Sequence, residues 1–517
     1  MISSKTLHPQ RVARHFGSLH LLCLLVVGVT LIHLRASVYD TISGARDLSS
    51  VSTIFKASHP IERLILQYEQ NYKQFVERQS KTPEEAITAY KKRYNRNPPP
   101  GFSKWVRYAL AHNSTVIDDY DRIEEKIAQF RTLSPFDLQR RIKIWQKTAR
   151  SFGTVKIQDG RFIEGEDRVQ KSLADIVDQL PDVEFLYSWL DEPRIIGVNR
   201  ESNKADSENM GGKNAWPLLT EKCNFPSEFQ AQRRWEGRTE PKFKYVEDLN
   251  ESLDVCRHPE YQHMHGFFNS PTTLPAVRSL IPLFSGAALS TMSDIITPGL
   301  DYIAPGYLGD SKTFDAIPYS EKKTQMYWKA WSTGSSFREE SYRFNHRVRF
   351  VQRFGTHPMF HIGFSRYVQC GDFCPQLEKL VGIVPNDDSK VGFQYKFAMD
   401  IDGNGYSGRY YRLLHSNCLV FKQTMWQQWH DDRLMPWVHY IPVSMSMDEL
   451  ESMVNYFAND TKGQVYGEKI AEAGRTWAEK SLRPIDITIY TYRQLLEYAN
   501  LFKEDTGSDR RTLAPQD

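Results

Sequence analysis

The residues with the clearest chemical potential lie in a glycine-rich turn followed by arginines. The pattern predicts a strand over 395–401, a turn over 402–408, a short helix over 409–415 and a second strand over 418–421. Gly403, Gly405 and Gly408 leave little bulk in the turn, and a helix that opens there can offer backbone amides to a diphosphate. Arg409 would add a charged donor fork for phosphate oxygens. On the pattern alone, a plain strand-to-helix connection with a solvent-facing arginine is equally acceptable.

A second candidate group is a carboxylate at the end of an apolar strand. Asp191 stands just before Pro193, where open α/β sheets place reactive side chains. A carboxylate there could take the proton of an attacking hydroxyl group if its pKa were modestly raised. Glu192 is the neighbouring candidate and is expected to point to the opposite side. The alternative is an aspartate that only bonds its own turn backbone.

Length and charge narrow the class of protein. The chain has 517 residues, which predicts two domains plus appendages rather than one core. A quarter of the residues are charged, yet the net charge is only +3. Nucleic-acid-binding proteins concentrate basic charge on one face, so nucleic acid is excluded as the expected partner.

The N-terminal region predicts a membrane anchor. Residues 19–34 form an apolar run without Asp, Glu, Lys or Arg, and basic residues precede it. We therefore expect a single-pass anchor with a cytoplasmic N-terminus, while a cleaved signal peptide is the alternative. The glycosylation sequons at Asn113, Asn250 and Asn459 agree with a lumenal position.

Five cysteines follow the anchor and are compatible with an oxidising compartment. We expect Cys223 to pair with Cys256 and Cys370 with Cys374. Cys418 lies in an apolar strand and is expected to be a buried free thiol.

Short strand-like segments alternate with helix-like segments along the chain. This alternation predicts an α/β protein with parallel strands. The final helix, 493–502, is amphipathic and could return to brace the first α/β block. The predicted organisation is a cytoplasmic tail (1–18), an anchor (19–35), a stem and helical region (36–153), a first Rossmann-like acceptor-side domain (154–310) with a polar, irregular insertion (199–255), a second Rossmann-like donor domain (311–483), and a C-terminal helix and tail (484–517).

Several segments resemble glycosyltransferase family 90, which contains fungal capsule-associated xylosyltransferases and animal protein O-glucosyltransferases. The most specific is the unbroken string Pro-Trp-Val-His-Tyr-Ile-Pro-Val at 436–443. The other matching segments are 94–105, 180–185, 190–194, 265–268, 281–285, 402–414 and 471–483. The resemblance implies a GT-B fold with two Rossmann-like domains facing a cleft, a UDP-sugar donor, inversion at the anomeric carbon, and no metal or other cofactor.

The resemblance also implies roles for individual residues. Asp191 corresponds to the catalytic base of the family. The loop from Ser332 to Arg338 resembles its second phosphate-side loop, and His346 and Arg347 could assist there. The complete predicted donor-binding set is Arg409, Ser407, Gly408, Arg338, Ser332, Thr333 and Gly403. A lone histidine near aromatic residues, such as His265 or His439, is more often structural than catalytic.

One segment departs from the family pattern. Where the fungal branch typically has Tyr-Trp-Arg-Gly-Ser, this chain has Tyr-Trp-Lys-Ala-Trp at 327–331. Lys329 lacks the bidentate fork of arginine, and Trp331 is expected to fill space where a nucleotide would lie. This departure motivates an alternative in which the protein is a degenerate family member that binds glycans or a partner without catalysis.

The favoured hypothesis is a Golgi or endoplasmic reticulum glycosyltransferase that uses a UDP-sugar, with xylose first and glucose second. Its acceptor would be a glycan, a glycolipid or a protein hydroxyl. A third hypothesis is a metal-dependent transferase, because Asp400 and Asp402 form an Asp-x-Asp pair that would share one face of a strand.

Overall fold

The computed structural model describes residues 57, 59–148, 152–199, 206–225, 245–304, 315–388 and 390–503. The predicted cytoplasmic tail, the predicted anchor and residues 36–56 of the predicted stem and helical region therefore lie outside the described residues. Within the described ranges, no helix combines the length and apolarity needed to cross a membrane. All tertiary contacts reported below lie within the compact unit that begins at Tyr68.

The N-terminal part of the described chain is helical. Its helices are α3 (Pro60–Glu77), α4 (Pro83–Tyr94), α5 (Phe102–Ala111), α6 (Asp121–Ala128) and α7 (Pro135–Thr148). The start of α4 follows from its sequence, because Thr82 is the N-cap and its hydroxyl accepts the Glu85 amide at 3.2 Å, with Pro83 at the first helical position.

A first five-stranded sheet follows, in the order β2-β1-β3-β7-β8. Its strands are β1 (Phe152–Gln158), β2 (Arg161–Glu164), β3 (Val183–Ser188), β7 (Leu283–Ser285) and β8 (Ile295–Ile296). Strands β3, β7 and β8 are parallel, as predicted, but β1 runs antiparallel to both β2 and β3. For β1 and β2 the reason is local, because Asp159 and Gly160 join them with positive φ angles of 51° and 69°, the geometry that favours a hairpin.

A smaller sheet lies in the same half of the chain, in the order β4-β6-β5. Its strands are β4 (Ile195–Asn199), β5 (Ser207–Asn209) and β6 (Pro275–Ser279), and the nearby helices are α8 (Asp167–Leu173), α9 (Trp216–Leu219), α11 (Leu249–Leu253) and α12 (Gly266–Asn269). The segment 199–255 is thus less irregular than predicted, because β5 pairs with β6. Both predicted disulfides are present, Cys223–Cys256 and Cys370–Cys374, and Cys418 is buried and free.

The second five-stranded sheet is entirely parallel, in the order β10-β9-β11-β12-β13. Its strands are β9 (Lys323–Trp331), β10 (Phe360–Arg366), β11 (Tyr395–Ile401), β12 (Leu419–Gln423) and β13 (Ile441–Val443). Its helices are α14 (His346–Phe354), α15 (Cys374–Val381), α16 (Tyr410–Leu414), α17 (Leu450–Asn459) and α18 (Thr461–Ser481). The strand order reverses between β9 and β11, and ligands of open α/β sheets bind beyond the carboxyl ends of strands at such a reversal.

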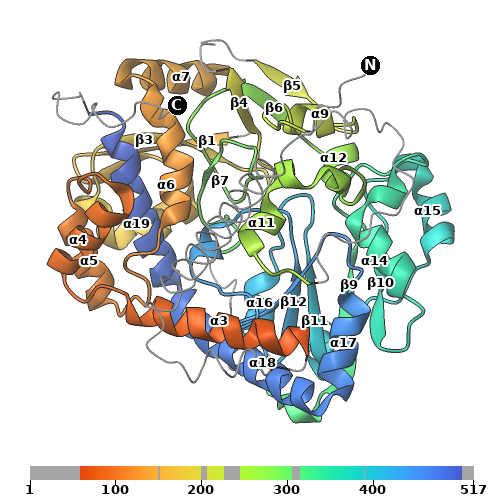
Figure 1. The fold of residues 1–517 in the computed structure, drawn as a ribbon. Coiled ribbons are helices and arrows are strands. Elements are labelled where there is room, and N and C mark those ends of the chain that lie inside the picture. The colour runs from red at the N-terminus through yellow and green to blue at the C-terminus, as the bar shows by residue number, and fades with distance from the viewer. Residues whose placement is uncertain are drawn as a thin grey trace, which may run out of the picture. The chain divides into compact units, whose positions relative to one another are not determined.

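Helix α19 (Pro484–Asn500) begins earlier than predicted, since Asp486 caps its first turn after Pro484. It runs beside α5 and α6 (Figure 1). The expected brace to the first sheet is present: Gln494 donates to the carbonyl of Ile296 in β8 at 2.6 Å, and Tyr498 donates to the carbonyl of Glu184 in β3 at 3.2 Å.

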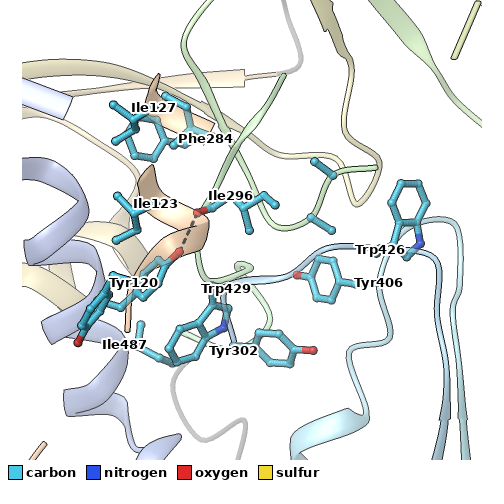
Figure 2. Packing of buried hydrophobic residues seen from close by; sticks show 14 of the residues in the cluster. Tyr120, Ile123, Ile127, Phe284, Ile296, Tyr302, Tyr406, Trp426, Trp429 and Ile487 are labelled. Atoms are coloured by element: carbon cyan, nitrogen blue, oxygen red, sulfur yellow. Dashed lines mark hydrogen bonds between the residues drawn. The ribbon is translucent and has the colours of Figure 1, made fainter. Parts of the chain in front are cut away.

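Aromatic side chains join the glycine-rich turn to the first half of the chain. Figure 2 shows Tyr302 and Tyr406 packed in one buried cluster with Ile296 and Trp429. The Tyr302 ring lies 5.3 Å from that of Tyr406, and the Tyr302 hydroxyl donates to the carbonyl of Ser407 at 2.9 Å. The turn is therefore anchored by its neighbours in the core.

Candidate active site

The carboxyl ends of β9 and β11 are joined by the guanidinium group of Arg347, near the start of α14. Its Nη1 donates to the carbonyl of Trp331, the last residue of β9, at 3.0 Å. Its Nε and Nη2 donate to the carbonyls of Asp402 and Ile401, at the end of β11, at 2.7 Å and 3.3 Å. Arg347 thus occupies the point where the strand order reverses, and three backbone carbonyls accept its hydrogen bonds.

A second guanidinium group lies close to the first. Arg409 donates from Nη1 to the carbonyl of Lys329 at 3.1 Å. Both cations approach the Trp328 ring, with Arg347 at 5.6 Å and Arg409 at 5.8 Å from its centroid. Burial first, and then the positive charge of Arg409, lower the pKa of Arg347 to about 9. An anion bound between these groups would relieve their mutual repulsion.

The glycine turn borders this cation pair. The Gly403 amide donates to the Gly405 carbonyl at 3.0 Å, so the turn is closed by its own backbone. A side chain on Gly403 would place its Cβ 3.4 Å from Nη2 of Arg347 and 3.7 Å from the hydroxyl of Thr333. Gly403 therefore lies in van der Waals reach of the guanidinium group and of Thr333. Gly403 and Thr333, both predicted as donor-binding residues, meet here.

The same turn contacts Asp191, the predicted base. A Cβ on Gly405 would lie 2.1 Å from the carbonyl oxygen of Asp191 and 3.1 Å from its Cβ. Only glycine permits this approach. One turn consequently touches the cation at Gly403 and the candidate base at Gly405.

The two neighbouring carboxylates differ in accessibility, as expected. Asp191 is exposed to solvent, whereas Glu192 is only 4% exposed. The surrounding protein removes part of the hydration of the Asp191 carboxylate and so raises its pKa. The negative charge of the nearby Asp301 carboxylate raises it further. Burial raises the pKa of Glu192 to about 7. A general base must be reached by the hydroxyl group it deprotonates, so accessibility favours Asp191.

Three predicted donor-binding residues are occupied by other contacts. The Ser407 hydroxyl donates to Asp400, and the Ser332 hydroxyl is buried and donates to the carbonyl of Val368 at 3.1 Å. A Cβ on Gly408 would lie 2.8 Å from a carboxylate oxygen of Asp301. The hydroxyl groups of Ser407 and Ser332 are thus engaged with other parts of the protein.

Arg338 lies apart from the cation pair. It is exposed, and a Cβ built on Gly212 would lie 2.7 Å from its Nη2. No contact described in the structure joins it to Arg347 or Arg409. Arg338 is predicted as a donor-binding residue and Arg347 as an assisting one. The loop pattern from which both predictions come does not show where either side chain lies in the folded protein.

Asn404 was not among the predicted residues, yet it connects three segments. Its Oδ1 accepts the Gly334 amide at 2.9 Å and lies 3.1 Å from the hydroxyl of Thr272. Its position between two glycines of the turn is the signal that could have identified it.

Two buried histidines support the turn from behind. His346 donates from Nε2 to the carbonyl of Asp402 at 2.7 Å and stacks on His265 with a centroid distance of 3.6 Å. Burial lowers the pKa of His346 to about 3 and that of His265 well below its usual value. Both rings are neutral, so they stack without charge repulsion and act as structural residues.

The Asp-x-Asp pair has partners that leave little room for a metal ion. Asp400 accepts the Lys422 ammonium group at 2.9 Å and the Ser407 hydroxyl, while Asp402 accepts the Met425 amide at 2.9 Å. Both carboxylates are fully buried, and burial raises the pKa of Asp402 to about 7. A divalent cation would have to displace the lysine ammonium group, so this pair does not fit the diphosphate-bound metal of the third hypothesis.

The departure from the family pattern at 329–331 leaves the cation pair intact. The Lys329 ammonium group pairs with Asp387 at 2.7 Å, while its carbonyl holds Arg409. Trp331, which is expected to fill space at the nucleotide, has a side chain that is 50% exposed and lies against Arg366, whose Cζ is 4.8 Å from the ring centroid.

Comparison with known proteins finds similarity in the segment that contains Arg347, Arg409 and the turn 402–408, while Asp191 lies outside that segment. Residues 272–512 match the family model described as Glycosyl transferase family 90. The chain is 32% identical to an O-glucosyltransferase rumi homolog of Aedes aegypti over 22% of this chain and 29% of the relative. It is 22% identical to the O-glucosyltransferase LpsA of Dichelobacter nodosus over 51% of this chain and 70% of the relative. It is 28% identical to Protein O-glucosyltransferase 3 of Homo sapiens over 33% and 32% of the two chains. The matched segments span less than a third of the insect and human relatives.

Proposed function

We propose that the protein transfers a sugar from a UDP-sugar to a hydroxyl group, with inversion at the anomeric carbon, because residues 272–512 match the family model described as Glycosyl transferase family 90. One observation carries the proposal: the turn 402–408 reaches Arg347 through Gly403 and Asp191 through Gly405. An anion site and an accessible carboxylate thereby adjoin the same turn.

The proposed mechanism uses these groups in one displacement. The acceptor oxygen forms a bond to the anomeric carbon while Asp191 takes the hydroxyl proton, and the bond from that carbon to the diphosphate oxygen breaks. Positive charge develops on the sugar ring, and negative charge on the departing diphosphate. Arg347 and Arg409 would stabilise that negative charge in a site that needs no reorganisation.

No metal or other cofactor is needed in this proposal, because two guanidinium groups supply the positive charge beside the leaving group. Asp400 and Asp402 keep a structural role through Lys422 and the Met425 amide. Chelating agents are accordingly expected to leave the activity unchanged.

For the donor sugar we propose xylose, on the resemblance to the fungal branch of the family. Glucose is the second candidate, because the similar proteins in insects, bacteria and mammals are named O-glucosyltransferases. Both donors belong in the same experiment.

The proposed location is the Golgi or endoplasmic reticulum lumen, behind a single-pass anchor at residues 19–35. The acceptor would be a glycan, a glycolipid or a protein hydroxyl. Asn113, Asn250 and Asn459 are all exposed, which suits carbohydrate attachment in that compartment.

The test compares the wild type with Asp191→Asn in UDP-sugar hydrolysis and transfer, using UDP-xylose and UDP-glucose with and without chelator. We expect the variant to lose about 100-fold or more in turnover while binding UDP as well as the wild type. The exposed Asp175→Asn is the matched control and should retain activity. Retained turnover in Asp191→Asn would contradict its role as base.

UDP binding separates catalysis from the alternative of a degenerate binding protein. A functional donor site should bind UDP at micromolar strength. An absence of both UDP binding and turnover in the wild type would favour the degenerate member.

A further inference from the structure

An exposed tryptophan lies next to the candidate base. Trp189 is 52% exposed and comes two residues before Asp191 in the sequence. Its indole contributes little to the hydrophobic core, although tryptophan is a large side chain that is usually well buried. Single exposed apolar residues are common, so the position of Trp189 has to be judged from its surroundings.

The indole is held in place by the sheet. A Cβ on Gly153 would lie 3.1 Å from both Cζ2 and Nε1 of Trp189. Gly153 pairs with Tyr187 across β1 and β3, so the ring folds back over the face of the sheet that carries Tyr187. The absence of a side chain at Gly153 makes room for this ring, and the other side of the indole remains accessible to solvent.

The carboxylate of Asp301 lies near the candidate base, since it raises the pKa of Asp191. Arg168 pairs with Glu166 at 2.7 Å, and both residues, together with Asp301, act on the pKa of Tyr187, the cross-strand partner of Gly153.

From this arrangement we infer that Trp189 is a stacking platform for a sugar ring of the acceptor, and that the acceptor is a glycan. This inference rests on the proposed function. A sugar ring presents an apolar C–H face and a rim of hydroxyl groups, and its apolar face matches the flat, half-exposed indole. Because Trp189 comes two residues before Asp191, a ring stacked there would be held on the segment that carries the candidate base.

The test measures acceptor binding and donor chemistry separately. Methyl glycosides of glucose, galactose, mannose and xylose serve as acceptor probes, and their binding in the presence of UDP is followed by saturation-transfer NMR and by the KM of transfer. We expect Trp189→Ala to raise the dissociation constant and the KM of the preferred glycoside about tenfold, the loss of roughly one stacking contact. Trp189→Phe should recover most of this loss.

The controls measure donor hydrolysis and UDP binding, neither of which involves the acceptor. Donor hydrolysis without acceptor and the Kd for UDP should be unchanged in Trp189→Ala. Ile163→Ala, which removes another exposed apolar side chain of the same sheet, should leave all values unchanged.

Several outcomes would overturn the inference while leaving the proposed function standing. These are an acceptor KM within twofold of the wild type in Trp189→Ala, a weakened Kd for UDP in that variant, or a wild type that glycosylates a folded protein but none of the glycosides. Failure of the wild type to bind UDP or to hydrolyse either donor would instead contradict the proposed function itself.

Discussion

Arg347 is a buried cation whose charge a bound anion would stabilise. Three backbone carbonyls hold its guanidinium group, yet burial and the neighbouring Arg409 still lower its pKa to about 9. The carbonyls fix its orientation without neutralising it. A diphosphate would supply the missing negative charge, which is why this residue, rather than the exposed Arg338, is the centre of the candidate donor site.

The buried carboxylate of Asp402 predicts a pH dependence of stability. Burial raises its pKa to about 7 in the folded protein, compared with about 4 in an unfolded chain. The folded state therefore holds this proton more tightly, and the contribution to stability is present below about pH 4 and is lost as the pH rises to about 7. His346, whose pKa is lowered to about 3, acts in the opposite direction.

We expect Asp402→Asn to remove the contribution of the Asp402 carboxylate to the pH dependence of stability, while His346 keeps its own contribution. The free energy of unfolding, measured by urea denaturation between pH 4 and pH 7, should fall less with rising pH in this variant than in the wild type. The asparagine oxygen can still accept the Met425 amide, so the fold should be retained. The exposed Asp175→Asn is the control. If the free energy of unfolding depended on pH in the same way in the wild type and in Asp402→Asn, the raised pKa of Asp402 would be contradicted.

At the scale of elements, the turn 402–408 aligns two functional groups that come from distant parts of the chain. Its register depends on the contact of Gly405 with the Asp191 carbonyl and on the bond from the Gly334 amide to Asn404. A small displacement of this turn would separate the anion site from the base. Misplacement by about 1 Å can reduce an enzymatic rate about 100-fold.

Gly405→Ala tests this dependence. Its Cβ would lie 2.1 Å from a backbone oxygen, so the turn and Asp191 must move apart. We expect sugar transfer to fall about 100-fold, with a lowered melting temperature. Gly165→Ala is the matched control, because its Cβ would meet the flexible Gln170 side chain at 3.2 Å. Full transfer activity in Gly405→Ala would show that the close contact is dispensable.

At the scale of the whole molecule, helix α19 carries a buried network of charges that joins it to the N-terminal helices. Glu497 accepts from Arg493 at 2.7 Å, from Arg96 at 2.9 Å and from the Tyr90 hydroxyl at 2.7 Å. Glu497 and Arg493 are almost fully buried. Because a buried charge without its partner is strongly unfavourable, this network couples the C-terminal helix to the folding of the remainder.

Removal of the central carboxylate should therefore be costly. We expect Glu497→Ala to lower the free energy of unfolding by about 3–5 kcal/mol in urea denaturation. The partly exposed pair of Arg475 and Glu479 provides the comparison, since Glu479→Ala should cost less than about 1 kcal/mol. A loss below 1 kcal/mol in Glu497→Ala would mean that the network does not couple α19 to the fold.

The sequence by itself determined those features that depend on neighbouring residues. The β11 strand has the predicted bounds because an apolar run meets a glycine turn, and α4 starts at Pro83 because Thr82 caps it. The two disulfides and the buried thiol of Cys418 were also predictable. The antiparallel hairpin of β1 and β2 was missed, although the Asp159–Gly160 pair is a known hairpin signal.

Only the tertiary structure decided which of the predicted polar residues meet. Arg347 lies at the reversal of strand order, which no local pattern shows, whereas Arg338 is exposed and lies against Gly212. Asn404 accepts the amide of Gly334, and the Trp189 ring packs against Gly153. In both pairs the partners are distant in the sequence. Periodicity and turn chemistry act over a few residues, whereas the candidate site depends on long-range contacts that form only when both sheets pack together.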